Sequence, residues 1–273
     1  EVNLERSRRL RSVFSSLDTG KILEEIAFET GQGPIDPNHC ILFLDEVQGV
    51  PEALQSLRYF YEDMPELPVI AAGSLLEFTL AKHSFPMPVG RIEYFHMGPV
   101  VFEEFLAAKE ESQLLELIGN WQMGEHFPIT GHDRLVRLMR EYLMTGGMPE
   151  AIQAYLDEGT FDAAFDVQRS LTETYQDDFS KYASGADLER LQSVLDFAAR
   201  TPGEKVKYVS IDSLAQARET KKAMGLLLKA GVVFKVRHSD ATGAPLGASV
   251  REKVFKLYSL DLGLMLRASG LNH

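Results

Sequence analysis

Two short apolar runs, each followed by polar residues, constrain the fold of this chain more than any other sequence feature. Residues 41–44 (ILFL) lead into Asp45 and Glu46, and residues 68–72 (PVIAA) are followed by a glycine and Ser74. Continuous apolar runs of this length are typical of buried parallel strands. Apolar residues recur at helical spacing between the two runs. The sequence therefore predicts a strand, a helix and a second strand, joined by a right-handed crossover in a parallel sheet.

A helical segment is predicted after these strands. Between Phe102 and about Tyr182 the apolar residues follow a helical period almost throughout. The expected breaks are glycines, at Gly119, Gly131, Gly146-Gly147 and Gly159. We expect residues 98–185 to form a helical lid that follows a core domain of residues 1–97.

A third domain is predicted for residues 186–273. Residues 187–200 are amphipathic, and two short helices are expected within residues 210–231. Two strand-like runs follow, at residues 232–238 and 253–260, with glycines and a proline in the turn between them. Three helices followed by a hairpin are the pattern of a winged helix-turn-helix.

The charge of the chain changes sign between its two parts. The formal net charge is −12, which argues against a general nucleic-acid binder. Residues 1–185 hold 14 Lys and Arg against 31 Asp and Glu, a balance of −17, whereas residues 186–273 hold 14 against 9, a balance of +5. Such a change suggests two functional units.

The composition predicts an intracellular globular protein. With 45% apolar and 25% charged residues, the chain resembles ordinary globular proteins. Its single cysteine, Cys40, excludes an internal disulfide and is expected to be a small buried hydrophobe. No apolar run approaches the roughly 20 residues that span a bilayer, so we expect a cytoplasmic protein without membrane contact. Because the chain begins with Glu1 rather than Met, we also expect its true N-terminus to lie further upstream.

The residues that follow the two predicted strands suit nucleotide chemistry. An aspartate that ends a strand at the carboxyl edge of a sheet can hold the magnesium of MgATP through water, and a glutamate next to it can activate the attacking water. Residues 42–46 (LFLDE) have this form, which is called a Walker B motif in P-loop ATPases. A strand followed by an acidic helix cap explains the same residues equally well. Ser74 stands where such enzymes place a polar residue near the attacking water, although a turn or helix N-cap also favours serine.

Ordered matches along nearly the whole chain resemble the prokaryotic AAA-type ATPases, whose core is followed by a C-terminal domain of unknown function. The matching segments are residues 2–5 (VNLE), 42–48 (LFLDEVQ), 50–52 (VPE), 72–76 (AGSLL), 88–91 (PVGR), 102–106 (FEEFL), 146–150 (GGMPE) and 256–264 (KLYSLDLGL). The resemblance implies an α/β fold class: a partial P-loop NTPase parallel sheet, the helical lid and the C-terminal winged helix-turn-helix.

The resemblance also implies roles for individual residues in hydrolysis of ATP with Mg²⁺. Asp45 would coordinate magnesium, Glu46 would activate water and Ser74 would act as the sensing polar residue. Arg91 matches a Gly-Arg pair and is a candidate for contacting nucleotide phosphates, in its own subunit or across a homo-oligomer as an arginine finger. A solvated arginine or a salt bridge to the acidic surface is the alternative for Arg91. We interpret the Gly146-Gly147 turn as a helix stop rather than a site.

The chain departs from this family in one respect that decides its chemistry. A phosphate-binding loop needs the pattern Gly-x4-Gly-Lys-Ser/Thr, which the 273 residues do not contain. Gly20-Lys21 is not such a loop, because Ser15 replaces the first glycine and Ile22 replaces the hydroxyl. In the family the loop precedes the segment that resembles residues 2–5, and a strand-rich, nuclease-like part follows the last residue here. We therefore expect a chain truncated at both ends, which binds ATP only when the upstream loop is restored.

The predicted winged helix offers a function of a different class. Basic residues are expected at the start of its recognition helix and on its wing, namely Arg218, Lys221, Lys222, Lys235, Arg237 and Arg251. Such side chains can contact the phosphates or base edges of DNA. The alternative is a protein-docking or oligomerisation module, with the remaining core as a scaffold. The histidines show no metal-ligand spacing.

Overall fold

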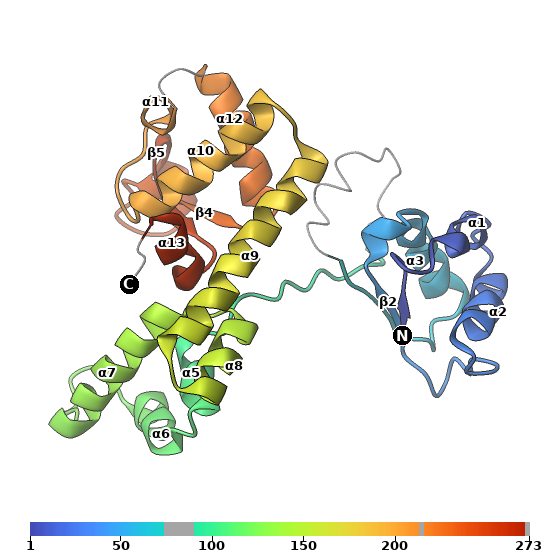
Figure 1. The fold of residues 1–273 in the computed structure, drawn as a ribbon, viewed down its shortest axis with the longest axis horizontal. Helices are drawn as coiled ribbons and strands as arrows, with labels where there is room; N and C mark the ends of the chain where they lie inside the picture. Colours follow the sequence, from blue (N-terminus) through green and yellow to red (C-terminus); the bar gives the residue numbers. More distant parts are fainter. Residues whose placement is uncertain (74–89, 213–215, 271–273) are drawn as a thin grey trace. The chain divides into compact units, whose positions relative to one another are not determined.

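The computed structural model describes residues 1–73, 90–212 and 216–270, and its chain forms two compact units, Glu1–His96 and Met97–His273 (Figure 1). The first unit contains the strand-helix-strand pattern. The second contains the helical segment together with residues 186–273. A boundary between residues 185 and 186 stays a prediction.

The described sheet of the first unit has three parallel strands in the order β1-β2-β3. They are β1 (Val2–Asn3), β2 (Leu42–Asp45) and β3 (Val69–Ala71), and Val2 pairs with Leu44 while Phe43 pairs with Ile70. Helix α3 (Glu52–Asp63) crosses from β2 to β3. The predicted strands and the crossover helix are thus confirmed.

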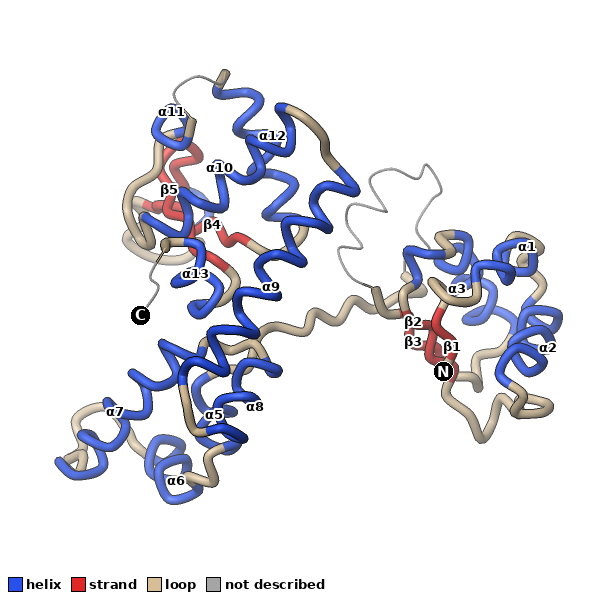
Figure 2. The backbone as a smooth tube through the Cα atoms, viewed as in Figure 1, coloured by secondary structure: helices blue, strands red, loops and turns tan. Residues whose placement is uncertain are grey.

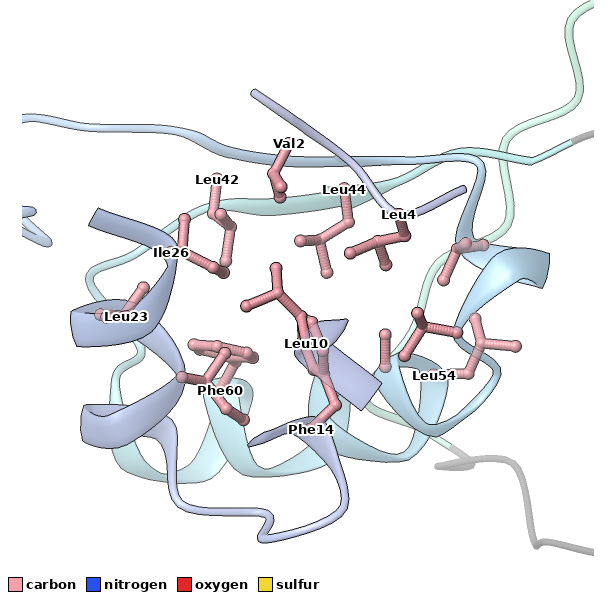
Figure 3. Packing of buried hydrophobic residues seen from close by; sticks show 14 of the residues in the cluster. Val2, Leu4, Leu10, Phe14, Leu23, Ile26, Leu42, Leu44, Leu54 and Phe60 are labelled. Carbon is pink, nitrogen blue, oxygen red and sulfur yellow. The ribbon is translucent and has the colours of Figure 1, made fainter. Parts of the chain in front are cut away.

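Helices pack against one face of this sheet (Figure 3). They are α1 (Arg11–Phe14), α2 (Thr19–Thr30) and α3, with the short 3-10 turns η1 (Arg8–Leu10) and η2 (Val47–Gly49). Leu42 and Leu44 point from β2 into this core, where Phe14 and Phe60 are also buried. Gly20 and Lys21 lie in the first turn of α2, and the carboxylate of Asp18 caps that turn by accepting the Lys21 N–H at 3.1 Å.

Two expectations about burial in the first unit are wrong. Ile70 of β3 is 49% exposed, because β3 is an edge strand of the described sheet and Ile70 does not face the core beneath it. Cys40 is exposed rather than buried, because it lies in the loop before β2 and not in the strand itself.

The second unit begins with the predicted helical segment. Its helices are α5 (Phe102–Ala108), α6 (Ser112–Asn120), α7 (Ile129–Thr145), α8 (Pro149–Glu158) and α9 (Phe161–Tyr182). Gly146 and Gly159 end α7 and α8 with φ of 69° and 68°, as expected of glycines that stop helices. Gly119 and Gly131 instead lie inside α6 and α7, near the helix ends, so these two predicted breaks are shifted by a few residues.

Three helices and an antiparallel hairpin follow, in the predicted order (Figure 2). The helices are α10 (Ala186–Arg200), α11 (Tyr208–Ile211) and α12 (Ala217–Lys229). The hairpin consists of β4 (Val233–Ser239) and β5 (Val250–Ser259), joined through the 3-10 turn η3 (Leu246–Ser249), and α13 (Leu262–Ala268) follows it. Val206 adds an antiparallel bridge to Phe255 on the free edge of β5. Among the described helices, none is long and apolar enough to cross a membrane.

A buried carboxylate ties the start of α13 to the turn between α7 and α8. Asp261 is only 4% exposed and accepts the Gly147 N–H at 2.5 Å and the Leu264 N–H at 2.9 Å. A Cβ on Gly146 would lie 2.6 Å from the Asp261 carboxylate, and one on Gly263 would lie 2.3 Å from the Gln168 amide. The turn at Gly146-Gly147 and the start of α13 at Gly263 therefore fit closely against each other, because glycine has no side chain at these positions.

Candidate functional site

Asp45 lies at the carboxyl end of β2, where its carboxylate is held from the neighbouring strand. The Asn3 side chain donates from Nδ2 to Asp45 Oδ2 at 2.9 Å. The two residues are direct partners in the parallel register of β1 and β2. Asp45 is half-buried, and along β2 it alternates with the core residues Leu42 and Leu44. Its side chain therefore stands on the face of the sheet opposite the described helices.

The orientation of Asn3 is itself fixed. Its side-chain oxygen accepts the backbone N–H groups of Glu5 and Arg6, each at 3.1 Å. Because the oxygen of the amide is engaged there, its NH₂ group must face Asp45. Asn3 is a residue whose role the sequence did not indicate. The only available signal was the segment of residues 2–5, whose contact with residue 45 depends on strand register.

Glu46 has a backbone conformation that few side chains adopt. Its φ and ψ are 51° and 47°, in the left-handed region. This conformation costs a residue other than glycine roughly 1–3 kcal/mol, and such residues cluster at functional sites. The Glu46 carboxylate accepts a hydrogen bond from Gln48 Nε2. Because Glu46 lies in a turn and not in the strand, strand alternation does not determine the direction of its side chain.

The turn that carries Glu46 is fixed from both neighbouring strands. The backbone of Ala72, just after β3, bonds Leu44 O at 2.8 Å and Val47 N at 3.0 Å. On the other side a Cβ at Gly49 would lie 3.0 Å from the backbone of residues 4 and 5. A side chain at this point would crowd the backbone, so a glycine lets the turn pack directly on the end of β1.

The other two residues predicted for this site have different outcomes. Ser74 lies outside the described residues. Arg91 forms an ion pair with Glu62, with 3.2 Å between Arg91 Nη2 and Glu62 Oε1. Glu62 is ten residues along α3 from Glu52, about 15 Å at 1.5 Å per residue, and α3 begins just after the Asp45-Glu46 turn. The structure thus places the Arg91 side chain at the far end of α3.

The side chains around Asp45 supply too few ligands to bind Mg²⁺ alone, but enough to bind it together with nucleotide phosphates. Mg²⁺ is usually bound by one or two carboxylates together with waters and substrate phosphate oxygens. Among the described residues, no group of three or more His, Cys, Asp and Glu side chains is arranged to hold a metal ion. Asp45 and Glu46 are adjacent, and the hydrogen bond from Asn3 engages one Asp45 oxygen, Oδ2. The residues present therefore fit a nucleotide-bound ion and not a metal held by protein alone.

The basic residues predicted on the recognition helix lie at its exposed start. Arg218, Lys221 and Lys222 occupy the first two turns of α12 and are exposed. The Lys222 ammonium lies 3.7 Å from the Asp187 carboxylate, an ion pair that remains largely open to solvent. These three residues therefore stay available to an anionic ligand.

The basic residues predicted on the wing are held by contacts within the chain. The Lys235 ammonium lies 4.3 Å from the centre of the Phe255 ring, a cation–π contact on the inner face of the hairpin. Arg251 forms an ion pair with Asp240, and this pairing holds the pKa of the Asp240 carboxyl below its ordinary value. Arg237 lies on β4, in register with Phe255. The structure therefore does not group the wing residues into a single basic patch.

Comparisons with known proteins identify both parts of the chain. A family model described as an AAA domain matches residues 1–106, and one described as a domain of unknown function (DUF8612) matches residues 136–273. No curated protein matches the chain. Among solved structures, a Walker-type ATPase of Pyrococcus abyssi is similar, with a TM-score of 0.52 and 16% identity, over 92% of this chain and 67% of that chain. At this identity the likeness shows the fold alone.

The chain belongs to the DUF8612 family, whose model matches residues 136–273, and its residues 1–106 match an AAA domain; together these matches support the predicted prokaryotic AAA-type P-loop ATPase family. The predicted fold class, an α/β fold with a partial P-loop sheet, is confirmed.

Proposed function

We propose that this protein binds and hydrolyses ATP at the carboxyl end of β2, and that hydrolysis acts on a partner molecule through the second unit. The observation that carries the proposal is the combination of a fixed Asp45 with a strained Glu46 beside it. A simple acidic helix cap would need neither the Asn3 hydrogen bond nor a left-handed backbone. The AAA family match supports the same chemistry.

Each residue has a separate task in this proposal. Asp45, oriented by Asn3, presents a carboxylate oxygen to the magnesium of MgATP, and this ion would neutralise charge on the phosphates. Glu46 orients the attacking water and accepts its proton. Ser74 completes the polar group beside that water. Arg91, at the far end of α3 from Asp45, would act on nucleotide held by a neighbouring subunit.

The phosphates also need a binding loop that the 273 residues do not contain. We therefore expect the chain itself to bind MgATP weakly, with no micromolar affinity in a calorimetric titration. In a longer version that carries such a loop upstream, Glu46→Gln should retain nucleotide binding and reduce hydrolysis by about a hundredfold or more. Asp45→Asn should weaken only the magnesium-dependent part of binding, and Ser74→Ala should slow turnover.

A matched control is Glu66→Gln, which removes an exposed carboxylate from the loop after α3. It should leave turnover unchanged. Normal hydrolysis by both Glu46→Gln and Asp45→Asn would refute the assignment of the site.

The open face of the sheet gives this proposal a structural test. Parallel sheets are normally covered on both faces, yet Ile70 is 49% exposed among the described residues. In the longer version that carries the phosphate-binding loop, we expect the additional residues to cover Ile70. An Ile70→Cys variant in a Cys40→Ser background should react with a thiol reagent quickly in the 273-residue chain and more slowly in the longer version. Phe28→Cys, on α2 and 77% exposed before substitution, is the control that should react equally in both. Equal rates for Ile70→Cys would contradict the proposal.

Duplex DNA binding is the second candidate function, with α10 to α12 and the hairpin as a winged helix. The observation that favours it is the exposed group of Arg218, Lys221 and Lys222 at the start of α12. Replacing Lys221 and Lys222 together by Glu should reduce both the affinity for a duplex and its dependence on salt. If the full chain gives no mobility shift at about 50 mM salt, where electrostatic binding is favoured, this candidate fails and a protein-docking role replaces it.

A further inference from the structure

The β4–β5 hairpin has two different faces. Val233, Phe255 and Leu257 point inward and are at most 1% exposed. Helices α10 and α12 pack on the hairpin, and Val206, bridged to Phe255, extends the same buried face. Because side chains alternate along each strand, the residues between these core positions point the other way.

The outward side of the hairpin combines aromatic and basic side chains. Phe234 and Tyr258 are direct cross-strand partners and are 49% and 37% exposed. Val236, 51% exposed, pairs with the exposed Lys256. We call this surface the outer face of the hairpin and define it by six residues: Lys205, Lys207, Phe234, Val236, Lys256 and Tyr258.

Lys205 and Lys207 join this face through the Val206 bridge. Since Val206 pairs antiparallel with Phe255, Lys205 lies opposite Lys256, and both side chains point outward. Gly203 lies in the turn before this bridge, with φ of 76°, and a Cβ there would approach the Tyr258 hydroxyl to 3.3 Å. This close approach places the turn that precedes Lys205 beside the Tyr258 side chain.

The charge of the outer face selects a polyanion. Its three lysines are exposed and form no ion pair with a carboxylate in the part of the chain that the structure describes. Asp240, which follows β4, forms an ion pair with Arg251 and contacts His238. Glu204 adjoins Lys205 in the sequence, but it lies in the turn before the bridge, and among the described residues it forms no ion pair with a lysine of this face.

The exposed rings of Phe234 and Tyr258 indicate which kind of polyanion this face binds. Paired aromatic rings on an open strand face can stack on the flat faces of nucleobases. In a duplex those base faces are already stacked on one another, so only an unpaired strand can present them. A ring that served only to cover apolar protein surface would not need lysines around it.

We propose that the outer face of the hairpin binds an unpaired polynucleotide strand. Phe234 and Tyr258 stack on its bases, and Lys205, Lys207 and Lys256 contact its phosphates. This surface is distinct from the start of α12, and it does not depend on the ATPase site or on duplex binding.

The test measures binding of the full 273-residue chain to a fluorescent oligothymidylate of twelve nucleotides by anisotropy. We expect binding that exceeds that of a duplex of equal length. Phe234→Ala should weaken binding by about five- to 150-fold, the range seen when a stacking ring is removed. With three phosphates neutralised, log K should fall against log salt with a slope of about −2, at about −0.7 per phosphate on a single strand. Lys205→Gln combined with Lys256→Gln should make this slope about 1.4 shallower.

Further variants separate stacking from apolar contact and from simple charge. Phe234→Leu keeps apolar volume without a ring face and should bind nearly as weakly as Phe234→Ala, while Tyr258→Phe keeps the ring and should bind normally. Phe28→Ala and Lys229→Gln remove an exposed ring and an exposed lysine elsewhere, and neither should affect binding. Circular dichroism melting checks that each variant is folded.

Several outcomes would overturn the proposal. These are no binding at about 50 mM salt, normal binding by Phe234→Leu, or equal competition by heparin, which has charge without bases. Normal single-strand binding by the Lys221→Glu, Lys222→Glu double variant is expected, whereas its loss would move the interaction to α12. The bases of DNA and RNA can both stack on these rings. The same measurement with an oligouridylate of twelve nucleotides therefore shows which of the two binds more tightly.

Discussion

Asp261→Ala tests whether the buried carboxylate holds the second unit together. The substitution leaves the N–H groups of Gly147 and Leu264 without their acceptor in a site that is 4% exposed. Each buried donor left unsatisfied costs about 1–3 kcal/mol, and loss of an N-cap alone costs about 0.5–2 kcal/mol. Because relief from burying a carboxylate offsets part of this cost, we expect the free energy of unfolding to fall by about 2–5 kcal/mol.

Asp261→Asn should have a smaller effect. Its side-chain oxygen can still accept one N–H, but the NH₂ group then faces the other donor. We expect a loss of about 1.5–3 kcal/mol, the scale of one hydrogen bond to a charged group. Glu158→Gln is the control, because it removes an exposed carboxylate from the same unit and should change the free energy by no more than about 0.5 kcal/mol.

The assay is urea denaturation followed by tryptophan fluorescence. The only tryptophan, Trp121, belongs to the second unit, so its signal reports that unit. Gly147→Ala is a second perturbation, since its Cβ would lie 2.4 Å from Val100 O. Because Gly147 and Asp261 share one contact, the double variant should lose less than the sum of the single losses. A change below about 0.5 kcal/mol for Asp261→Ala would refute the reasoning.

Three further predictions concern the first unit. In the longer version that carries the phosphate-binding loop, Asn3→Ala should weaken magnesium-dependent nucleotide binding by about tenfold, as expected for a residue that orients a ligand. Calorimetry with and without Mg²⁺ measures this effect. An unchanged affinity would show that Asn3 does not belong to the site. In the same version, mixing Arg91→Ala protein with Glu46→Gln protein should restore some ATPase activity if Arg91 acts across subunits, whereas no recovery would leave Arg91 acting in its own subunit or not at all. The pKa of Glu29 is lowered from its ordinary value of 4.5 by the hydrogen bond from Ser7 and by Arg9. The stabilisation that the Glu29 carboxylate provides is therefore present above about pH 4.5 and is lost as the pH falls through the lowered pKa. Melting temperatures between pH 3 and pH 7 should therefore fall less steeply for Glu29→Gln than for the unmodified chain.

Local patterns in the sequence predicted the elements but not the contacts between distant segments. The run that ends at Asp45 and the turn between residues 240 and 247 carry their own signals, because apolar periodicity and turn residues act over a few positions. The hydrogen bond from Asn3 to Asp45 spans 42 residues, and that from Gly147 to Asp261 spans 114. Both depend on how elements pack. For the same reason Cys40, at the edge of an apolar run, was misassigned to the core.

The charge distribution of the second unit restricts where a polynucleotide can bind. Residues 97–185 hold 6 Lys and Arg against 16 Asp and Glu, a balance of −10, whereas residues 186–273 have a balance of +5. Both stretches lie within one compact unit. Exposed charges act over about 10 Å at 0.1 M salt, so the acidic helices repel phosphates near them while the lysines of the outer face attract phosphates locally. A bound strand is therefore confined to the hairpin, and raising the salt weakens the attraction and the repulsion together.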